Sequence, residues 1–261
     1  MNEYIAFLLG IVQGLTEFLP VSSSGHLELV KALSLERNLG PESLLFTIVL
    51  HFATALSTLV VFRKEVAKIL KELFTFKSTP SFYFSCYIIL SMIPAALVGL
   101  FLEDLINSLF DQNILLVGCM LLLTGGLLFL ADRAKKTDQE ISPKSALLIG
   151  LMQAVAILPG ISRSGATIAT AVLLGVDKEK AARFSFLMVI PLIFGSMAKS
   201  ILDADTLYTN DAITPLFVGF LTAFFTGFIA CKWMISIVKK AQLKYFSYYC
   251  FVVGVIALIF M

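Results

Sequence analysis

The chain has 261 residues, of which 58% are hydrophobic and 15% are charged, and its mean hydropathy is +0.91. This apolar share lies well above that of an ordinary globular domain and argues against a soluble protein. The formal net charge of +2 leaves no excess of basic residues for a nucleic-acid partner. We therefore predict an all-α integral membrane protein.

Hydropathy divides the chain into six full membrane crossings and two interrupted apolar regions, because a spanning helix needs about 20 mostly apolar residues. In chain order these are the interrupted region 4–35, crossings 44–62, 82–102 and 114–131, the interrupted region 145–176, and crossings 184–202, 213–230 and 246–260. Pro, Gly and hydroxyl residues break each interrupted region near its middle. Half of such a region would form a helix of roughly 20 Å, which is too short to reach the far side. We interpret both regions as re-entrant helix–loop–helix hairpins.

The distribution of Lys and Arg predicts the orientation, since these residues accumulate in cytoplasmic loops. Loops 63–81, 132–144, 177–183 and 239–244 are basic, whereas loops 103–113 and 203–212 contain no Lys or Arg. The alternation fits two hairpins that return to the side they entered from, the first open outward and the second inward. Four full crossings in place of the two hairpins would give the same sidedness, so the charges leave that alternative open.

The two interrupted regions are copies of one another. A shift of 140 residues aligns residues 6–25 with 146–165, and seven of the twenty positions are identical. Beyond shared Leu and Ala, the identities pair Gly10 with Gly150, Gln13 with Gln153, Ser22 with Ser162, Ser24 with Ser164 and Gly25 with Gly165. Three crossings separate the copies, and this odd number makes them enter from opposite faces. The sequence predicts an inverted-topology repeat, approximately 4–131 and 144–260, within a single membrane domain, 1–261.

Ionisable residues inside apolar regions are costly, and they therefore point to function. If residues 5–18 are helical, Gln13 and Glu17 share one face, one turn before Pro20 ends the helix. The loop after it contains hydroxyl groups, a glycine and a histidine at Ser22, Ser23, Ser24, Gly25 and His26. These residues lie where a second helix begins, and a helix N-terminus favours phosphate.

The second loop has the same pattern, Ser162, Arg163, Ser164 and Gly165, with an arginine where the first loop has Ser23. A guanidinium group suits bidentate capture of phosphate oxygens. In folds with inverted repeats, the interrupted helices of the two copies meet near the bilayer midplane. We therefore predict one phosphate site between the two loops. His51, inside a crossing, is expected to be structural.

Two blocks of the chain resemble the undecaprenyl-diphosphate phosphatases, the bacitracin-resistance family of bacterial membrane enzymes. The blocks are QGLTEFLPVSSSGHL, residues 13–27, and PGISRSGATI, residues 159–168. The resemblance implies six crossings plus two inverted hairpins in the bacterial cytoplasmic membrane. It also implies hydrolysis of undecaprenyl diphosphate to the monophosphate at the outer face. That reaction recycles the lipid carrier of peptidoglycan and other cell-wall polymers, and it confers resistance to bacitracin.

Residues at the family's motif positions are Glu17, Ser22, Ser23, His26 and Arg163. Gln13 stands where many relatives have a glutamate, which puts in doubt a mechanism that needs two acidic side chains from this motif. We expect Arg163 to hold the terminal phosphoryl group and Ser23 to attack it, with His26 or Glu17 as the base. A water nucleophile is the alternative. The expected substrate-binding residues are Gln13, Ser22, Ser24, Gly25, Ser162, Ser164 and Gly165.

A bare carboxylate at Glu17 would repel a diphosphate. A bound Mg²⁺ or Ca²⁺ between Glu17 and phosphate oxygens would remove this conflict. The alternative is that burial keeps Glu17 protonated, so that it acts as a general acid.

The expected partners are a polyprenyl diphosphate lipid and membrane lipids. Inverted repeats are also common in transporters, so the competing function is a flippase for a polyprenyl phosphate lipid. The sequence leaves open whether two copies associate as a homodimer.

Overall fold

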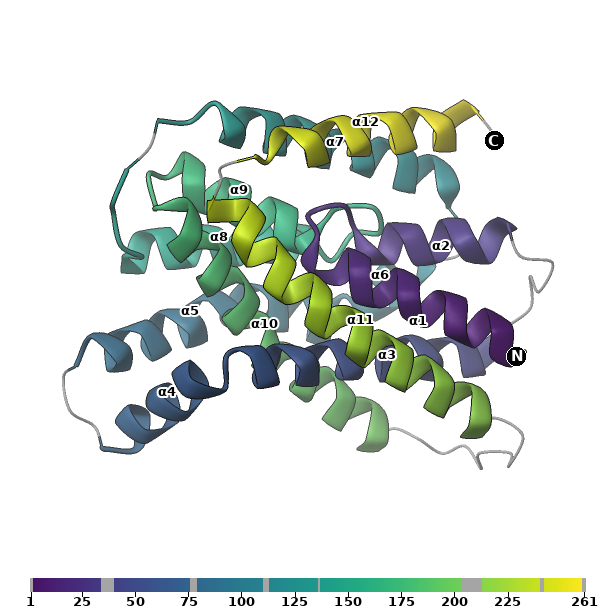
Figure 1. Cartoon of the computed structure of the whole chain (residues 1–261), viewed down its shortest axis with the longest axis horizontal. Coiled ribbons are helices and arrows are strands. Elements are labelled where there is room, and N and C mark those ends of the chain that lie inside the picture. Colours follow the sequence, from purple (N-terminus) through teal and green to yellow (C-terminus); the bar gives the residue numbers. More distant parts are fainter. Residues whose placement is uncertain are drawn as a thin grey trace.

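The computed structural model describes residues 2–33, 40–75, 79–109, 113–135, 137–202, 213–239 and 242–259, and its elements are helices (Figure 1). The helices are α1 (Glu3–Phe18), α2 (Ser23–Leu33), α3 (Gly40–Val61), α4 (Arg63–Thr75), α5 (Pro80–Phe101), α6 (Glu103–Leu109), α7 (Ile114–Asp132), α8 (Pro143–Val155), α9 (Arg163–Leu173), α10 (Lys178–Leu202), α11 (Ile213–Lys239) and α12 (Lys244–Ile259). The all-α membrane class is therefore confirmed.

Each of the six predicted crossings coincides with one continuous helix. Four of these helices, α5, α7, α10 and α11, are long and apolar enough to cross a membrane. Helix α12 is apolar but has only 16 residues. Helix α3 continues into α4 through a bend of 84°. Together the two helices are long and apolar enough to cross a membrane as one broken span. The described residues thus supply four candidate spans, or five with the bent pair. The predicted loop 203–212 lies outside the described residues.

Helix α4 occupies a segment that the charge pattern assigned to a loop. Val66 and Ile69 pack against the main hydrophobic core, whereas Lys64, Lys68 and Lys71 are exposed. This 3.6-residue periodicity makes the segment an amphipathic helix, a pattern that counting basic residues alone does not detect.

Both interrupted regions are broken where the sequence predicted. Helix α1 ends at Phe18, two residues before Pro20, whose ring removes a backbone donor. Helix α2 then begins at Ser23 and runs back beside α1 (Figure 1). In the second region, α8 ends at Val155 and α9 begins at Arg163, and these two helices also pack on one another. Each region therefore forms two short helices with a loop between them.

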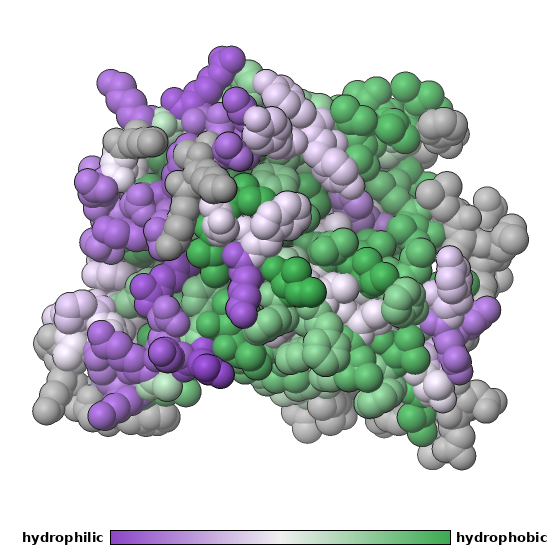
Figure 2. All heavy atoms as spheres, viewed as in Figure 1, coloured by the Kyte–Doolittle hydropathy of each residue, from purple (hydrophilic) through white to green (hydrophobic). Residues whose placement is uncertain are grey.

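The outer surface of the molecule is suited to lipid. Ile89, Ile93 and Leu97, which follow one another by one turn of α5, are 52%, 48% and 49% exposed. Apolar residues cover the middle of the face shown in Figure 2, and hydrophilic residues gather at the end that holds α4 and the segment after α7. An apolar band of this kind matches a multi-pass membrane protein.

Small residues allow the interrupted helices to approach the long ones closely. A Cβ atom at Gly10 of α1 would lie 2.7 Å from Thr222 Oγ1 of α11, and one at Gly14 would overlap the hydroxyl of Thr226. Gly150 of α8, the counterpart of Gly10, lies in the same way against the backbone of Ser91 in α5. Close backbone contact through glycine is a common basis of helix association in membranes.

We therefore expect Gly14→Ala to lower the thermal stability of the protein in detergent. Overpacking typically costs about 1–3 kcal/mol, which corresponds to several degrees in Tm for a chain of this size. Gly126→Ala in α7 is the matched control, because a Cβ atom there would meet nothing within 4 Å. Equal melting temperatures for the two variants would contradict the expected close packing of α1 on α11.

Candidate functional site

The loops of the two interrupted regions touch, as the repeat predicted. A Cβ atom at Gly25 would lie 3.1 Å from the Cα of Gly160, and one at Gly165 would lie 3.2 Å from the Cβ of Pro20. The 140-residue shift relates Gly25 to Gly165 and Pro20 to Gly160, so each contact is the counterpart of the other. Side chains at either glycine would push the loops apart, which explains why both copies have glycine there.

Each loop caps the helix that follows it through the same serine. Ser22 Oγ accepts a hydrogen bond from the backbone N–H of Gly25 (3.1 Å), and Ser162 Oγ accepts one from Gly165 (3.0 Å). The Ser164 hydroxyl donates to the carbonyl oxygen of Leu19 in the other loop (3.3 Å). Hydroxyl groups at these matched positions therefore hold the two helix N-termini and join the loops.

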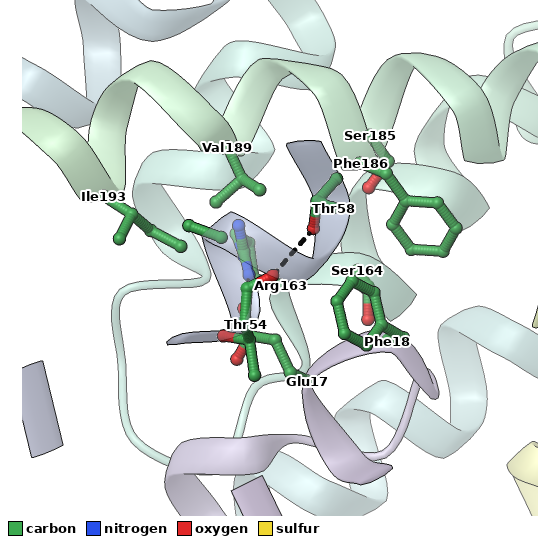
Figure 3. Close-up of a pocket in the computed structure, with 11 residues that line it drawn as sticks. Glu17, Phe18, Thr54, Thr58, Arg163, Ser164, Ser185, Phe186, Val189 and Ile193 are labelled. Carbon is green, nitrogen blue, oxygen red and sulfur yellow. Dashed lines mark hydrogen bonds and ion pairs between the residues drawn. The ribbon is translucent and has the colours of Figure 1, made fainter. Parts of the chain in front are cut away.

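Glu17 lies at the centre of the site, in the last turn of α1, and is 6% exposed. Its Oε1 atom forms an ion pair with Arg163 Nη2, at the start of α9. Its Oε2 atom accepts a hydrogen bond from the hydroxyl of Ser23 (2.8 Å). Figure 3 shows Glu17 and Arg163 directed toward one another from different helices. The structure thus brings together three of the four expected catalytic side chains.

Gln13 and His51 complete the surroundings of Glu17. Gln13 Nε2 donates to Glu17 Oε2 (2.9 Å) and lies 3.0 Å from His51 Nδ1, which is itself 3.3 Å from Glu17 Oε2. His51 therefore lies within reach of both the Gln13 amide and the Glu17 carboxylate. The sequence analysis expected His51 to be structural and did not place it beside Glu17. The available signal was a histidine inside a crossing, in a chain with only two histidines.

His26 does not join this group. Its Nδ1 atom lies 2.7 Å from the carbonyl oxygen of Ser22, and its Nε2 atom lies 2.7 Å from the hydroxyl of Tyr249 in α12. Both ring nitrogens are therefore engaged away from Ser23. Of the two bases that the sequence left open, the geometry favours Glu17, because Ser23 already donates to it.

Two buried polar atoms at the site have no hydrogen-bond partner within the described part of the chain. One is Nη1 of Arg163 and the other is Oε1 of Gln13. An unpaired buried donor or acceptor is costly, so each indicates an external group that pairs with it. The N–H of Arg163 Nη1 suits a phosphate oxygen as its partner. Oε1 of Gln13 suits a hydrogen-bond donor or a cation.

Arg163 lines a pocket between α1, α3, α9 and α10 (Figure 3). Part of its wall is formed by charged and hydroxyl side chains, and the rest is formed by apolar side chains. The charged and hydroxyl residues are Glu17, Thr54, Thr58, Arg163, Ser164 and Ser185, and the apolar residues are Phe18, Ala55, Phe186, Val189 and Ile193. Such a mixed lining suits a ligand that carries both phosphate and hydrocarbon.

Protein ligands for a metal ion are few. Over the residues that the structure describes, no group of three His, Cys, Asp or Glu side chains could hold a metal ion. Glu17 and the unpaired Oε1 of Gln13 offer oxygen atoms on adjacent turns of α1. This donor set fits a hard cation that takes most of its ligands from substrate phosphates and water.

Comparison with known proteins gives a match along nearly the whole chain. The family model described as bacitracin resistance protein BacA matches residues 6–256. An undecaprenyl-diphosphatase of Christiangramia forsetii is 58% identical over 260 residues, which cover 100% of this chain and 98% of the relative. Undecaprenyl-diphosphatases of Bacteroides fragilis and Bacillus cereus are 49% and 39% identical, over 99% and 97% of this chain and 98% and 96% of the relatives.

Proposed function

We infer, because the chain belongs to the bacitracin resistance protein BacA family, that it is an undecaprenyl-diphosphatase. It hydrolyses undecaprenyl diphosphate to undecaprenyl phosphate and inorganic phosphate, which returns the lipid carrier to cell-wall synthesis. The observation that supports this function most directly is the contact of Arg163 and Ser23 with one buried carboxylate, Glu17. An arginine with an unpaired N–H and a hydroxyl beside a base are the groups that phosphoryl transfer requires.

The proposed topology is a single membrane domain, 1–261, with six crossings and two re-entrant hairpins related by an inverted repeat. Packing supports this arrangement, since α1 lies on α11 while its counterpart α8 lies on α5, the counterpart of α11. The reciprocal glycine contacts of the two loops support it as well. In this topology the first hairpin opens outward, and the active site faces the outer side of the bacterial cytoplasmic membrane.

In the proposed reaction, Ser23 Oγ attacks the terminal phosphorus and its proton passes to Glu17 Oε2. The bond to the bridging oxygen breaks, and undecaprenyl phosphate leaves. Arg163 holds the terminal phosphoryl oxygens and stabilises the charge that develops on them. Glu17 gives the proton it took from Ser23 to the leaving undecaprenyl phosphate and is again a carboxylate. It then takes a proton from the water that attacks the phosphoserine, and it returns this proton to Ser23 Oγ as the phosphorus–oxygen bond breaks and inorganic phosphate leaves. The alternative route, direct attack by a water molecule activated by Glu17, uses the same contacts.

Around these groups, the first turns of α2 and α9 are proposed to attract the phosphates through the positive ends of their helix dipoles. The residues proposed to bind substrate in this way, or through a side chain, are Gln13, Ser22, Ser24, Gly25, Ser162, Ser164 and Gly165. The hydrocarbon tail lies along the apolar wall of the pocket or in lipid.

A divalent cation, Mg²⁺ or Ca²⁺, is proposed to accompany the diphosphate, held by Glu17 and Gln13. When bound, it neutralises phosphate charge beside the carboxylate. We expect a chelator such as EDTA to reduce turnover at least about 10-fold and added Mg²⁺ or Ca²⁺ to restore it. Gln13→Glu adds a second carboxylate and should lower the Mg²⁺ concentration needed for half-maximal rate. Full activity in EDTA would reject the cation.

The proposed function is tested with purified protein in detergent, supplied with undecaprenyl diphosphate, by measuring released phosphate. The enzymatic function is supported if the wild-type protein releases phosphate and a matched preparation of Arg163→Ala does not. Binding of the lipid without release would instead favour the alternative, a carrier that moves a polyprenyl phosphate lipid across the membrane.

A further inference from the structure

We infer that Tyr249 is a positioning residue for the reaction: its hydroxyl group orients His26, and His26 holds the turn that presents Ser23 to Glu17. The inference rests on the proposed function. Tyr249 lies in α12, 223 residues away from His26, so it lies outside the sequence motif around the serine loop.

The two hydrogen bonds of His26 define its tautomer. A carbonyl oxygen can only accept, so the contact of 2.7 Å between Nδ1 and the Ser22 carbonyl requires the proton on Nδ1. In the neutral ring, Nε2 is then an acceptor, and the Tyr249 hydroxyl at 2.7 Å donates to it. The two rings also stack, with centroids 5.5 Å apart and planes 11° from parallel. The Ser22 carbonyl thus determines the tautomer, and Tyr249 holds the orientation of the imidazole through the other ring nitrogen.

The carbonyl that His26 holds belongs to an unusual residue. Ser22 has φ of 71°, and within the described residues it is the non-glycine position with a left-handed backbone. Such a conformation is unfavourable for a residue with a Cβ and persists only where its surroundings hold it. The Ser22 carbonyl accepts both from the backbone N–H of His26 (3.1 Å) and from its Nδ1. The next residue is Ser23, whose hydroxyl donates to Glu17 Oε2 with the turn in this form.

The rest of α12 provides a rigid support for Tyr249. The helix packs on α7, and the hydroxyl of Ser247 donates to the Gly125 carbonyl (2.7 Å) in a fully buried contact. Tyr245 and Tyr248 of the same helix are 58% and 52% exposed and take no part in the His26 pair. Tyr248 is therefore a matched control for the loss of a tyrosine hydroxyl.

The test uses the full-length protein in lipid nanodiscs and compares Tyr249→Phe with Tyr248→Phe. Tyr249→Phe keeps the stacked ring and loses one hydrogen bond, and we expect kcat for undecaprenyl diphosphate to fall about 10-fold with KM unchanged. Tyr248→Phe should stay within about 2-fold of the wild type. Because Tyr249 acts through His26, the double variant His26→Ala/Tyr249→Phe should be no slower than His26→Ala.

A spectroscopic measurement tests the same contact without turnover. The chain has two histidines, so ¹⁵N-histidine labelling gives signals from only two imidazoles, and the His26→Ala spectrum assigns them. We expect the unprotonated Nε2 signal of His26 to move downfield in Tyr249→Phe and to stay in place in Tyr248→Phe. Wild-type kcat in Tyr249→Phe, an unmoved Nε2 signal, or additive losses in the double variant would each overturn the inference. A wild-type protein that releases no phosphate would reject the proposed function, while the nitrogen signals would still decide the hydrogen bond.

Discussion

Arg163→Ala is expected to reduce phosphate release at least about 100-fold, the scale on which loss of a charge-stabilising donor acts. The guanidinium group has two roles that alanine cannot replace: Nη2 pairs with Glu17, and the buried Nη1 remains available for a phosphate oxygen. Arg163→Lys keeps the charge but not the planar fork, and it should remain at least about 10-fold slower than the wild type. The measurement is kcat/KM for undecaprenyl diphosphate.

Loss of Arg163 also leaves the Glu17 carboxylate buried without its cation, which destabilises a protein strongly. Thermal unfolding therefore accompanies the kinetic measurement. The double variant Arg163→Ala/Glu17→Gln removes the unpaired charge, and we expect it to regain stability but not activity. Near-normal turnover in a folded Arg163→Ala protein would reject the assigned role.

Glu17→Gln should have an effect of similar size, at least about 100-fold in kcat, because the amide cannot take the proton of Ser23. The side chain keeps its volume and can still accept a hydrogen bond from the Ser23 hydroxyl, so a general loss of packing is avoided. Glu28→Gln is the matched control. It changes another glutamate that is 7% exposed and belongs to the neighbouring helix α2, outside the contacts of Glu17.

In single-turnover experiments at saturating substrate, the chemical step should slow in Glu17→Gln. A rate close to that of the wild type would show that another group accepts the proton. His51, 3.3 Å from Glu17 Oε2, would then be the first residue to examine.

Much of the architecture follows from local properties of the sequence. Hydropathy located six continuous helices because about 20 consecutive apolar residues have no other stable state in a bilayer. Pro20 and the glycine- and serine-rich loops located both interruptions, since these residues end one helix and cap the next. The matched register of the two copies was sufficient to expect that Glu17, Ser23 and Arg163 meet.

Only the tertiary structure decided which side chains pair within the site. The choice of Glu17 over His26 as the partner of Ser23 depends on how the loop turns at Ser22, and a left-handed serine has no sequence signal. His51 contacts Glu17 from α3, and Tyr249 contacts His26 from α12. Hydrophobic periodicity specifies that a helix forms and which face is apolar. The hydrogen bonds between helices distant in the chain are selected by their packing, which brings particular donors to about 3 Å from particular acceptors.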